Sequence, residues 1–254
     1  MAKMLVENVN VSNLAQAIKG MRNPLESWKD SDSIVMCCKY TKPDAKSPMG
    51  STGLSIPFGV NLSEFNQTAD LVIVDFELGE KDKALAIKLI KAGTDHCKFL
   101  RQIGFIADIT APMTWWWDFD TYKVATTKNS TSRMHKLGSR PLTMEDFGWD
   151  STVDVVDLEA MSLRRRVVQD INERIENWRN AKEARSMAPT ELRARWRAIV
   201  DDLPQSYLFK ATWSGSYQTL RSVWFSRKGH KQVEFDMFRD VIAELPCGEF
   251  ITTQ

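Results

Sequence analysis

The stretch of this sequence that most limits its possible folds covers residues 105–133, FIADITAPMTWWWDFDTYKVATTKNSTSR. Apolar residues alternate with others up to Pro112, which indicates a strand with one buried face. Three consecutive tryptophans follow, and at least one must pack inside because neighbouring helical residues cannot all face one way. The stretch ends in hydroxyl and amide side chains closed by Arg133, groups that suit phosphate and carbonyl ligands better than a core. It therefore predicts an aromatic block beside a loop for a flat, anionic ligand.

Charge and hydropathy exclude several classes of partner. The formal net charge of +1 over 254 residues provides no general field for a nucleic acid or an anionic membrane, so we expect no nucleic-acid polymer as partner. No apolar window is long enough to span a bilayer, and we expect a cytoplasmic protein without membrane contact.

Metal-binding and disulfide-forming residues are few and scattered. The cysteines include an adjacent pair but no CxxC spacing, which favours buried, reduced thiols over a zinc site. The three histidines are spread too widely to indicate a multi-histidine metal site, and we expect no metal. These residues are Cys37, Cys38, Cys97, Cys247, His96, His135 and His230.

Hydrophobic periodicity predicts strands in the first 110 residues and helices in the rest. Residues 33–40 fit either a buried strand or a buried helix. The other expected elements are strands at 4–11 and 70–76, loops at 41–59 and 138–153, and helices at 14–21, 80–91, 154–187, 189–202, 217–227 and 231–245. Asn13 should cap the first of these helices, and Gly93 should close the second.

This segregation of strands and helices predicts the α+β class, with an antiparallel or mixed sheet and a bundle of long helices. No repeat or long linker interrupts the chain, so we expect a single domain over residues 1–254. The longest helix carries one apolar stripe, and the basic run 164–166 lies mostly off it. A solvated face explains that run better than an anion site.

General catalytic motifs are missing. The sequence contains neither GxGxxG nor GxxxxGK[ST], so neither a Rossmann dinucleotide site nor a P-loop is supported, and GxSxG is also absent.

Residues 121–133, TYKVATTKNSTSR, resemble the signature of the flavin-dependent thymidylate synthase family, Arg-His-Arg-x-x-Ser-x-Asn-Glu-x-Ser-x-Arg. At four positions this sequence has a residue of the same chemical type as the signature, namely Lys123, Thr126, Thr131 and Arg133. Four depart, namely Thr121, Tyr122, Lys128 and Asn129. The flanks keep the family's spacing from about residue 80 to residue 245: FIADITAP and MTWWWDFD precede the signature, and Leu203-Pro204, Trp213, Ser216, the segment 220–227 and Gln232-Val233-Glu234 follow it.

This resemblance implies a homotetramer with active sites at subunit interfaces. It implies FAD as cofactor, a pyrimidine deoxynucleotide such as dUMP as substrate, methylenetetrahydrofolate as carbon donor and NADPH as hydride source. The implied protein is a thymidylate-synthase-like flavin-dependent methyltransferase of nucleotide biosynthesis. No side-chain nucleophile attacks the pyrimidine in that family.

The resemblance also implies roles for single residues. Arg227 would be catalytic and would face the pyrimidine carbonyls, because a fixed positive charge stabilises an anionic ring. The implied cofactor contacts are Tyr122, Lys123, Asn129, Ser216 and Ser222. The implied nucleotide contacts are Asp118, Thr131, Ser132, Arg133 and Arg227.

Asp118 stands where the family has a glutamine that reads the nucleotide. An ionised carboxylate accepts hydrogen bonds and donates none, so it suits an amino group better than a carbonyl. The substrate is therefore expected to be dUMP or a drifted base such as that of dCMP. A second hypothesis is a catalytically silent protein that binds a nucleotide or flavin on the same scaffold.

Overall fold

The computed structural model describes residues 3–41, 53–54, 58–65 and 71–254. Two compact units make up the chain, and each is assembled from three separate segments. Unit 1 comprises Met1–Val9, Ile106–Ser214 and Arg227–Val241, and unit 2 comprises Asn10–Phe105, Gly215–Ser226 and Ile242–Gln254. A single domain over residues 1–254 stays a prediction.

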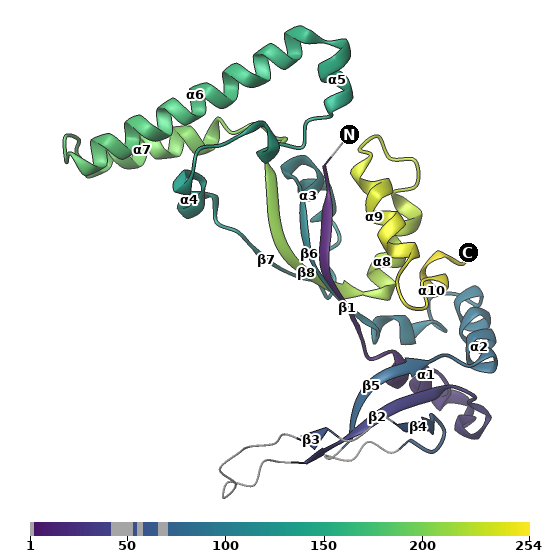
Figure 1. The fold of residues 1–254 in the computed structure, drawn as a ribbon. Coiled ribbons are helices and arrows are strands. Elements are labelled where there is room, and N and C mark those ends of the chain that lie inside the picture. Colours follow the sequence, from purple (N-terminus) through teal and green to yellow (C-terminus); the bar gives the residue numbers. More distant parts are fainter. Residues whose placement is uncertain (1–2, 42–52, 55–57, 66–70) are drawn as a thin grey trace, which may run out of the picture. The chain divides into compact units, whose positions relative to one another are not determined.

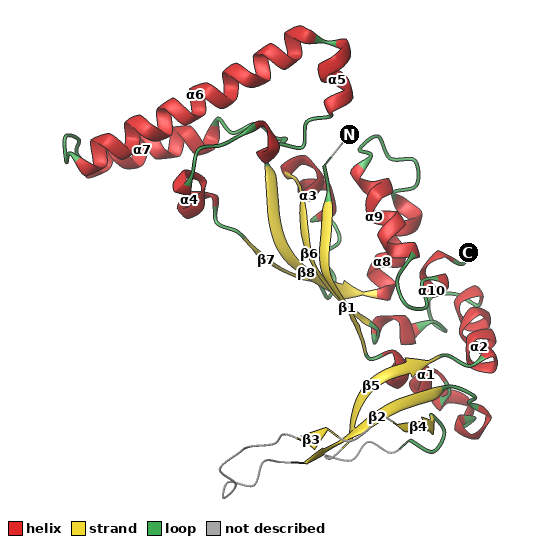
Figure 2. Ribbon diagram, in the orientation of Figure 1, coloured by secondary structure: helices red, strands yellow, loops and turns green. Residues whose placement is uncertain are grey.

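Helices and antiparallel strands are mixed along the chain, which confirms the α+β class (Figures 1 and 2). The strands are β1 (Leu5–Ser12), β2 (Ile34–Thr41), β3 (Gly53–Leu54), β4 (Phe58–Asn61), β5 (Leu71–Glu77), β6 (Gly104–Pro112), β7 (Thr127–Ser130) and β8 (Leu208–Ser216). The α-helices are α1 (Leu14–Met21), α2 (Glu80–Lys91), α3 (Met113–Phe119), α4 (Arg133–Lys136), α5 (Ser151–Val156), α6 (Leu158–Glu183), α7 (Pro189–Asp201), α8 (Tyr217–Ser226), α9 (Glu234–Ala243) and α10 (Glu249–Thr252).

One four-stranded sheet has the order β1-β6-β8-β7. The pairing of β7 with β8 is antiparallel and runs from Thr127 opposite Ser214 to Ser130 opposite Ala211. Among the described residues, β1 to β6 lie in about the first 110 residues, as expected, but β7 and β8 lie in the part where only helices were expected. For β7 the cause is composition, since it reads TKNS and is exposed throughout, so it lacks the apolar alternation that identifies a strand.

The core of unit 1 beneath this sheet is aromatic. Trp115 is fully buried and stacks on Phe119 with ring centroids 4.3 Å apart and an interplanar angle of 18°. Phe235 and Phe238 of α9 also contact the Trp115 ring. Trp117, by contrast, is 56% exposed. The prediction that at least one tryptophan packs inside is confirmed, and this packing fixes α3 against α9.

Helices α6 and α7 form a hairpin whose core contains Val168, Ile171, Ile175, Trp196 and Ile199. The predicted apolar stripe is confirmed, but the predicted helix 154–187 is two helices. Residue Asp157 separates them because its side chain accepts a hydrogen bond from the backbone N–H of Ala160 (2.9 Å) and caps α6.

Two further expectations about this region have clear outcomes. The predicted loop 138–153 contains two short segments of 3-10 helix, the end of Leu137–Ser139 and Met144–Asp146, and its last residues lie in α5. Arg165 and Arg166 are exposed, while the Arg164 guanidinium lies 5.5 Å from the Trp149 ring. The run 164–166 is therefore mainly a solvated face.

The sheet of unit 2 is built on β2, which pairs antiparallel with β3, β4 and β5. The segment 33–40 is thus a strand rather than a helix. The prediction of a loop at 41–59 is wrong at β3 and at the start of β4. These strands are too short for their sequences to show the alternation of apolar residues that identifies a strand. Residues 42–52 and 55–57 of that prediction lie outside the described residues.

Helices α1 and α2 begin and end where the sequence predicts. Gly93 takes a φ of +106°, which suits the glycine that closes α2. Asn13 does precede α1, but it has a φ of +64° and its side chain makes no capping hydrogen bond. That part of the prediction is wrong, because the left-handed backbone at Asn13 replaces the extended conformation of a normal N-cap.

A buried ion pair joins the end of α1 to α2 in unit 2. Arg22 Nε donates to Asp82 Oδ1 at 2.6 Å, and the two side chains are 5% and 0% exposed. The hydroxyls of Ser31 (2.6 Å) and Ser33 (2.5 Å) donate to Asp82 Oδ2. Every oxygen of this buried carboxylate therefore has a partner, as burial of a charge requires.

None of the helices within the described residues is long and apolar enough to cross a membrane. All four cysteines are free; Cys37, Cys38 and Cys97 are buried, and Cys247 is half-buried.

Candidate functional site

The candidate site of unit 1 starts at the end of α3. Trp115 and Phe119 anchor this helix in the aromatic core, and the side chain of Asp118 between them is 40% exposed. The chain then turns, and Tyr122 follows with its ring 5.8 Å from that of Phe119. The packing of α3 thus sets both a carboxylate and a phenol at one end of the core.

Arg227 binds both of these residues. Its Nε donates to Tyr122 Oη at 3.0 Å, and its Nη2 donates to the backbone oxygen of Asp118 at 3.1 Å. The guanidinium carbon lies 4.7 Å from the ring centroid of Phe235 and 5.6 Å from that of Tyr122. Since the side chain is only 17% exposed, aromatic contacts and hydrogen bonds hold the guanidinium in one place.

His230 and Gln232, which follow Arg227 in the sequence, complete this cluster. His230 Nε2 lies 3.1 Å from Arg227 Nη1 and 3.8 Å from Asp118 Oδ2. Gln232 Nε2 donates to Asp118 Oδ2 at 3.3 Å, and the Gln232 backbone N–H donates to His230 Nδ1 at 3.2 Å. We call Asp118, Tyr122, Arg227, His230 and Gln232 the Arg227 cluster. It gathers the nitrogen atoms of three side chains, Arg227, His230 and Gln232, around the carboxylate of Asp118.

The cluster contains an unsatisfied polar atom. Gln232 Oε1 is buried and has no hydrogen-bond partner in the part of the chain that the structure describes. Such an atom costs free energy, because burial removes its hydrogen bond to water without a replacement.

The signature residues after Tyr122 lie on exposed backbone. Lys123 and Asn129 are exposed, and Asn129 pairs with Thr212 across β7 and β8. Lys128 forms an ion pair with Asp120 and lies 5.1 Å from the Trp116 ring. Lys128 therefore has a local role at this surface, whereas Lys123 and Asn129 are open to a ligand.

The predicted phosphate loop begins where β7 ends. The backbone N–H of Thr131 donates to the oxygen of Lys210 at 3.0 Å, and the Thr131 hydroxyl donates to the same oxygen at 3.2 Å. Ser132 precedes α4, and neither it nor Thr131 is buried. Arg133 is also exposed, and its Nη1 lies 3.0 Å from Met113 Sδ. The loop is anchored on one side by β8 and presents its hydroxyls to solvent.

Ser216 and Ser222 belong to unit 2. Ser216 is 8% exposed, and its hydroxyl accepts from the backbone N–H of Thr219 (3.3 Å) at the start of α8. Ser222 donates to the oxygen of Gln218 one turn earlier (3.1 Å). Both hydroxyls thus have structural partners within α8, and their cofactor role stays a prediction.

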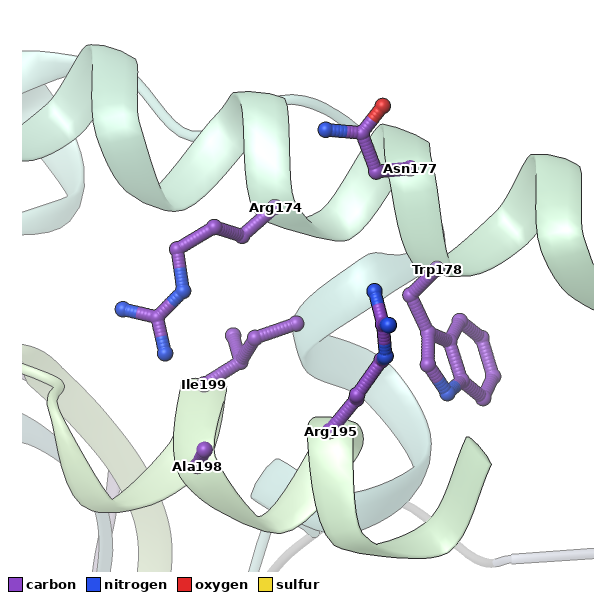
Figure 3. Close-up of a pocket in the computed structure, with 6 residues that line it drawn as sticks. All are labelled: Arg174, Asn177, Trp178, Arg195, Ala198 and Ile199. Atoms are coloured by element: carbon purple, nitrogen blue, oxygen red, sulfur yellow. The ribbon is translucent and has the colours of Figure 1, made fainter. Parts of the chain in front are cut away.

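A small cavity lies elsewhere in unit 1, between α6 and α7 (Figure 3). Its volume is about 200 Å³ and its lining includes Arg174, Trp178 and Arg195. The two arginines are already paired, Arg174 with Asp202 at 2.8 Å and Arg195 with Glu191 at 2.8 Å. The cavity therefore has no surplus positive charge for an anion. Within the described residues, no three metal-binding side chains come together.

The structure brings together three of the residues singled out from sequence, Asp118, Tyr122 and Arg227. It places Thr131, Ser132 and Arg133 at the end of β7, where Thr131 bonds to Lys210 and Arg133 to Met113. Sequence reasoning missed His230. The sequence does place His230 between Arg227 and Gln232, and that position could have identified it as a site residue. In the structure Gly229 turns the chain just before His230, with a φ of +67°.

Comparison with known proteins gives a likeness of fold. No family model matches the sequence, and no curated protein matches it. Among solved structures, thymidylate synthase X (ThyX) from Helicobacter pylori with FAD and dUMP, at 2.31 Å resolution, superposes with a TM-score of 0.56 and 13% identity, covering 100% of this chain and 98% of that one. A second structure of the flavin-dependent thymidylate synthase ThyX from Helicobacter pylori, complexed with FAD and dUMP, superposes with a TM-score of 0.55 and 13% identity. The match covers 98% of this chain and 97% of that one. The chain therefore has the fold of thymidylate synthase X along its whole length.

Proposed function

We propose that this protein is a flavin-dependent, thymidylate-synthase-like enzyme that transfers a one-carbon unit from methylenetetrahydrofolate to a pyrimidine deoxynucleotide. The observation that carries the proposal is the contact of Arg227 with Tyr122 and Asp118. Tyr122 lies in the segment that resembles the family signature, and Asp118 and Arg227 lie in its two flanks. Their direct contact in a fold that matches ThyX supports a common site.

Arg227 would stabilise negative charge on the pyrimidine ring. Its guanidinium is held from two sides before any ligand arrives, and preorganised charge is the form of electrostatic stabilisation that costs no reorganisation. Asp118 would read the base. Its Oδ2 accepts from Gln232, while its Oδ1 has no hydrogen bond to the described residues and suits an amino group. This geometry supports dCMP beside dUMP as a candidate substrate.

The residues implied as cofactor contacts fit a flavin in part. Tyr122 offers an aromatic ring and a phenol, and Lys123 and Asn129 are exposed donors. Ser216 and Ser222 fit less well, because both hydroxyls already serve α8. Bound FAD would supply hydride transfer, with NADPH as the source. Thr131, Ser132 and Arg133 would bind the nucleotide phosphate, for which hydroxyls and a guanidinium are suited.

Lys123, Asn129 and Arg133 lie on the exposed surface of the chain, which suits a site that a second subunit completes. We therefore include a homotetramer in the proposal. Its test is the molar mass in solution from light scattering, where a monomer at micromolar concentration would contradict it.

The first experiment measures flavin binding. Purified protein is titrated with FAD, and the expected result is a saturable change in flavin absorbance and fluorescence. Protein that neither carries nor takes up FAD would refute the flavin-dependent enzyme.

The second experiment measures turnover. Release of tritium from the C5 position of labelled dUMP or dCMP is followed with methylenetetrahydrofolate, FAD and NADPH. Release from one nucleotide identifies the base. Binding of FAD or nucleotide without release from either would favour the alternative, a catalytically silent nucleotide- or flavin-binding protein on the same scaffold.

A further inference from the structure

Large aliphatic side chains are exposed where α5 leads into α6. They are Val155 and Val156 at the end of α5 and Leu158 and Leu163 in the first two turns of α6. Their exposed fractions run from 54% for Leu163 to 84% for Val156. Four such residues within a short segment form a patch, and an exposed apolar patch of this kind marks an interaction surface.

This patch continues onto the outer face of α6, away from the hairpin core. Val168 and Ile171 of α6 pack in that core with α7 (Figure 1). Glu159, Leu163 and Arg166 are exposed. Leu163 comes four residues after Glu159 and three residues before Arg166, so the geometry of a helix puts the three side chains on one face. We call these three residues the α6 outer stripe.

The two charged residues of the stripe have no partner within their own chain. Among the described residues, neither the Glu159 carboxylate nor the Arg166 guanidinium makes a hydrogen bond or an ion pair. Other charges of α6 are paired, such as Arg174 with Asp202 at 2.8 Å. An acid and a base on either side of an exposed leucine are therefore left for a binding partner.

The stripe is complementary to itself when two copies run in opposite directions. Glu159 and Arg166 lie equally far on either side of the midpoint between residues 162 and 163. A two-fold axis through that midpoint places Glu159 of each copy opposite Arg166 of the other, with the two Leu163 side chains beside the axis. A contact of this type uses the same surface on both copies, as the interfaces of two-fold symmetric dimers do.

We infer that the α6 outer stripe, together with Val155, Val156 and Leu158 beside it, binds the same surface of a second copy of this chain in the antiparallel direction. A different partner would have to present a base, an apolar side chain and an acid in the matching order, and α6 itself presents them. The unlike charges fix the direction of pairing, and the aliphatic side chains provide the buried contact. The inference goes beyond the proposed function, which includes a homotetramer but names no surface, and it requires neither flavin nor nucleotide.

Charge reversal tests the pairing. Glu159→Arg places arginine opposite arginine across the axis, and Arg166→Glu places glutamate opposite glutamate, so each variant alone should lose self-association. In an equimolar mixture of the two variants, every pair across the axis again joins unlike charges. The double variant with both substitutions in one chain also restores the pairs. Glu176→Arg is the matched control, because it makes the same change at an exposed position of α6 outside the stripe.

Sedimentation velocity without ligand, over a series of protein concentrations, gives the molar mass of each protein. The unmodified protein and Glu176→Arg should self-associate, and each stripe variant alone should associate about tenfold more weakly or less. The mixture and the double variant should recover the association, which excludes misfolding as the cause of the loss. An unmodified protein that stays monomeric, single variants that associate like it, or a mixture that stays dissociated would each overturn the inference.

Titration of the same proteins with FAD keeps this inference distinct from the proposed function. An unmodified protein that takes up FAD but stays monomeric overturns the self-association surface and leaves the flavin-dependent enzyme standing. An unmodified protein that takes up no FAD, while its stripe variants associate only when mixed, refutes the enzyme and supports the surface.

Discussion

Arg227 Nε donates a hydrogen bond to Tyr122 Oη across 3.0 Å, although the two residues are 105 positions apart in the chain. This bond ties the turn after α3 to the segment before α9. Since both partners are half-buried, the bond should contribute to folding as well as to any ligand site.

Tyr122→Phe removes the phenol oxygen and leaves a half-buried charged donor without that partner. We expect it to lower the free energy of unfolding by about 1–3 kcal/mol. Urea unfolding of Tyr122→Phe, Arg227→Ala and the double variant gives the coupling energy directly. Strictly additive effects would show that the bond contributes nothing.

Arg227→Ala should abolish tritium release from the nucleotide, and Arg227→Lys should restore little of it. A lysine keeps the charge but cannot donate to Tyr122 and the Asp118 backbone at once. Arg197→Ala is the control, because Arg197 is exposed and pairs with Asp201 on its own helix. Full release by Arg227→Ala would remove this residue from the proposed mechanism.

Asp82→Ala should destabilise unit 2 by about 3–5 kcal/mol, since it leaves the guanidinium of Arg22 buried without its counter-charge. The neighbouring substitution Lys83→Ala breaks the exposed pair with Glu249 and should leave the urea midpoint unchanged. Equal midpoints for the two variants would contradict the role given to the buried pair.

Burial raises the pKa of Glu234 above its usual value, so the folded protein binds this proton more tightly than the unfolded chain does. The resulting penalty is absent below the unfolded pKa and grows as pH rises through the folded one. We therefore expect Glu234→Gln to raise the melting temperature at pH 7 and to have little effect at pH 4. Melting curves at both pH values test this, and a difference that is independent of pH would contradict it.

Trp115→Ala should lower the free energy of unfolding by about 3–5 kcal/mol, because it removes the centre of the aromatic core formed with Phe119 and Phe235. Trp117→Ala provides the comparison from the same helix. Trp117 is 56% exposed, so this variant should lose far less stability. Denaturant midpoints decide between them. A larger loss for Trp117 would mean that this exposed ring is buried in an assembly.

Local signals in the sequence were enough for helices α1, α2 and α7, because each has an apolar period of a helix and clear stop residues. The stripe on α6 was also readable, but the break at Asp157 was not. A capping carboxylate within an otherwise helical pattern looks like one more polar residue until its hydrogen bond to Ala160 is seen.

By itself, the sequence determined the α+β class, the strand before Pro112, the packing of at least one tryptophan and the candidate residues Asp118, Tyr122 and Arg227. The first three follow from periodicity and steric rules, which are local properties of the chain, and the three candidate residues come from the resemblance to the flavin-dependent thymidylate synthase family. Only the tertiary structure decided that β7 pairs with β8, that Arg227 contacts Tyr122, and that His230 and Gln232 stand beside them. These contacts join segments about a hundred residues apart, and their energy depends on distances that no local pattern encodes.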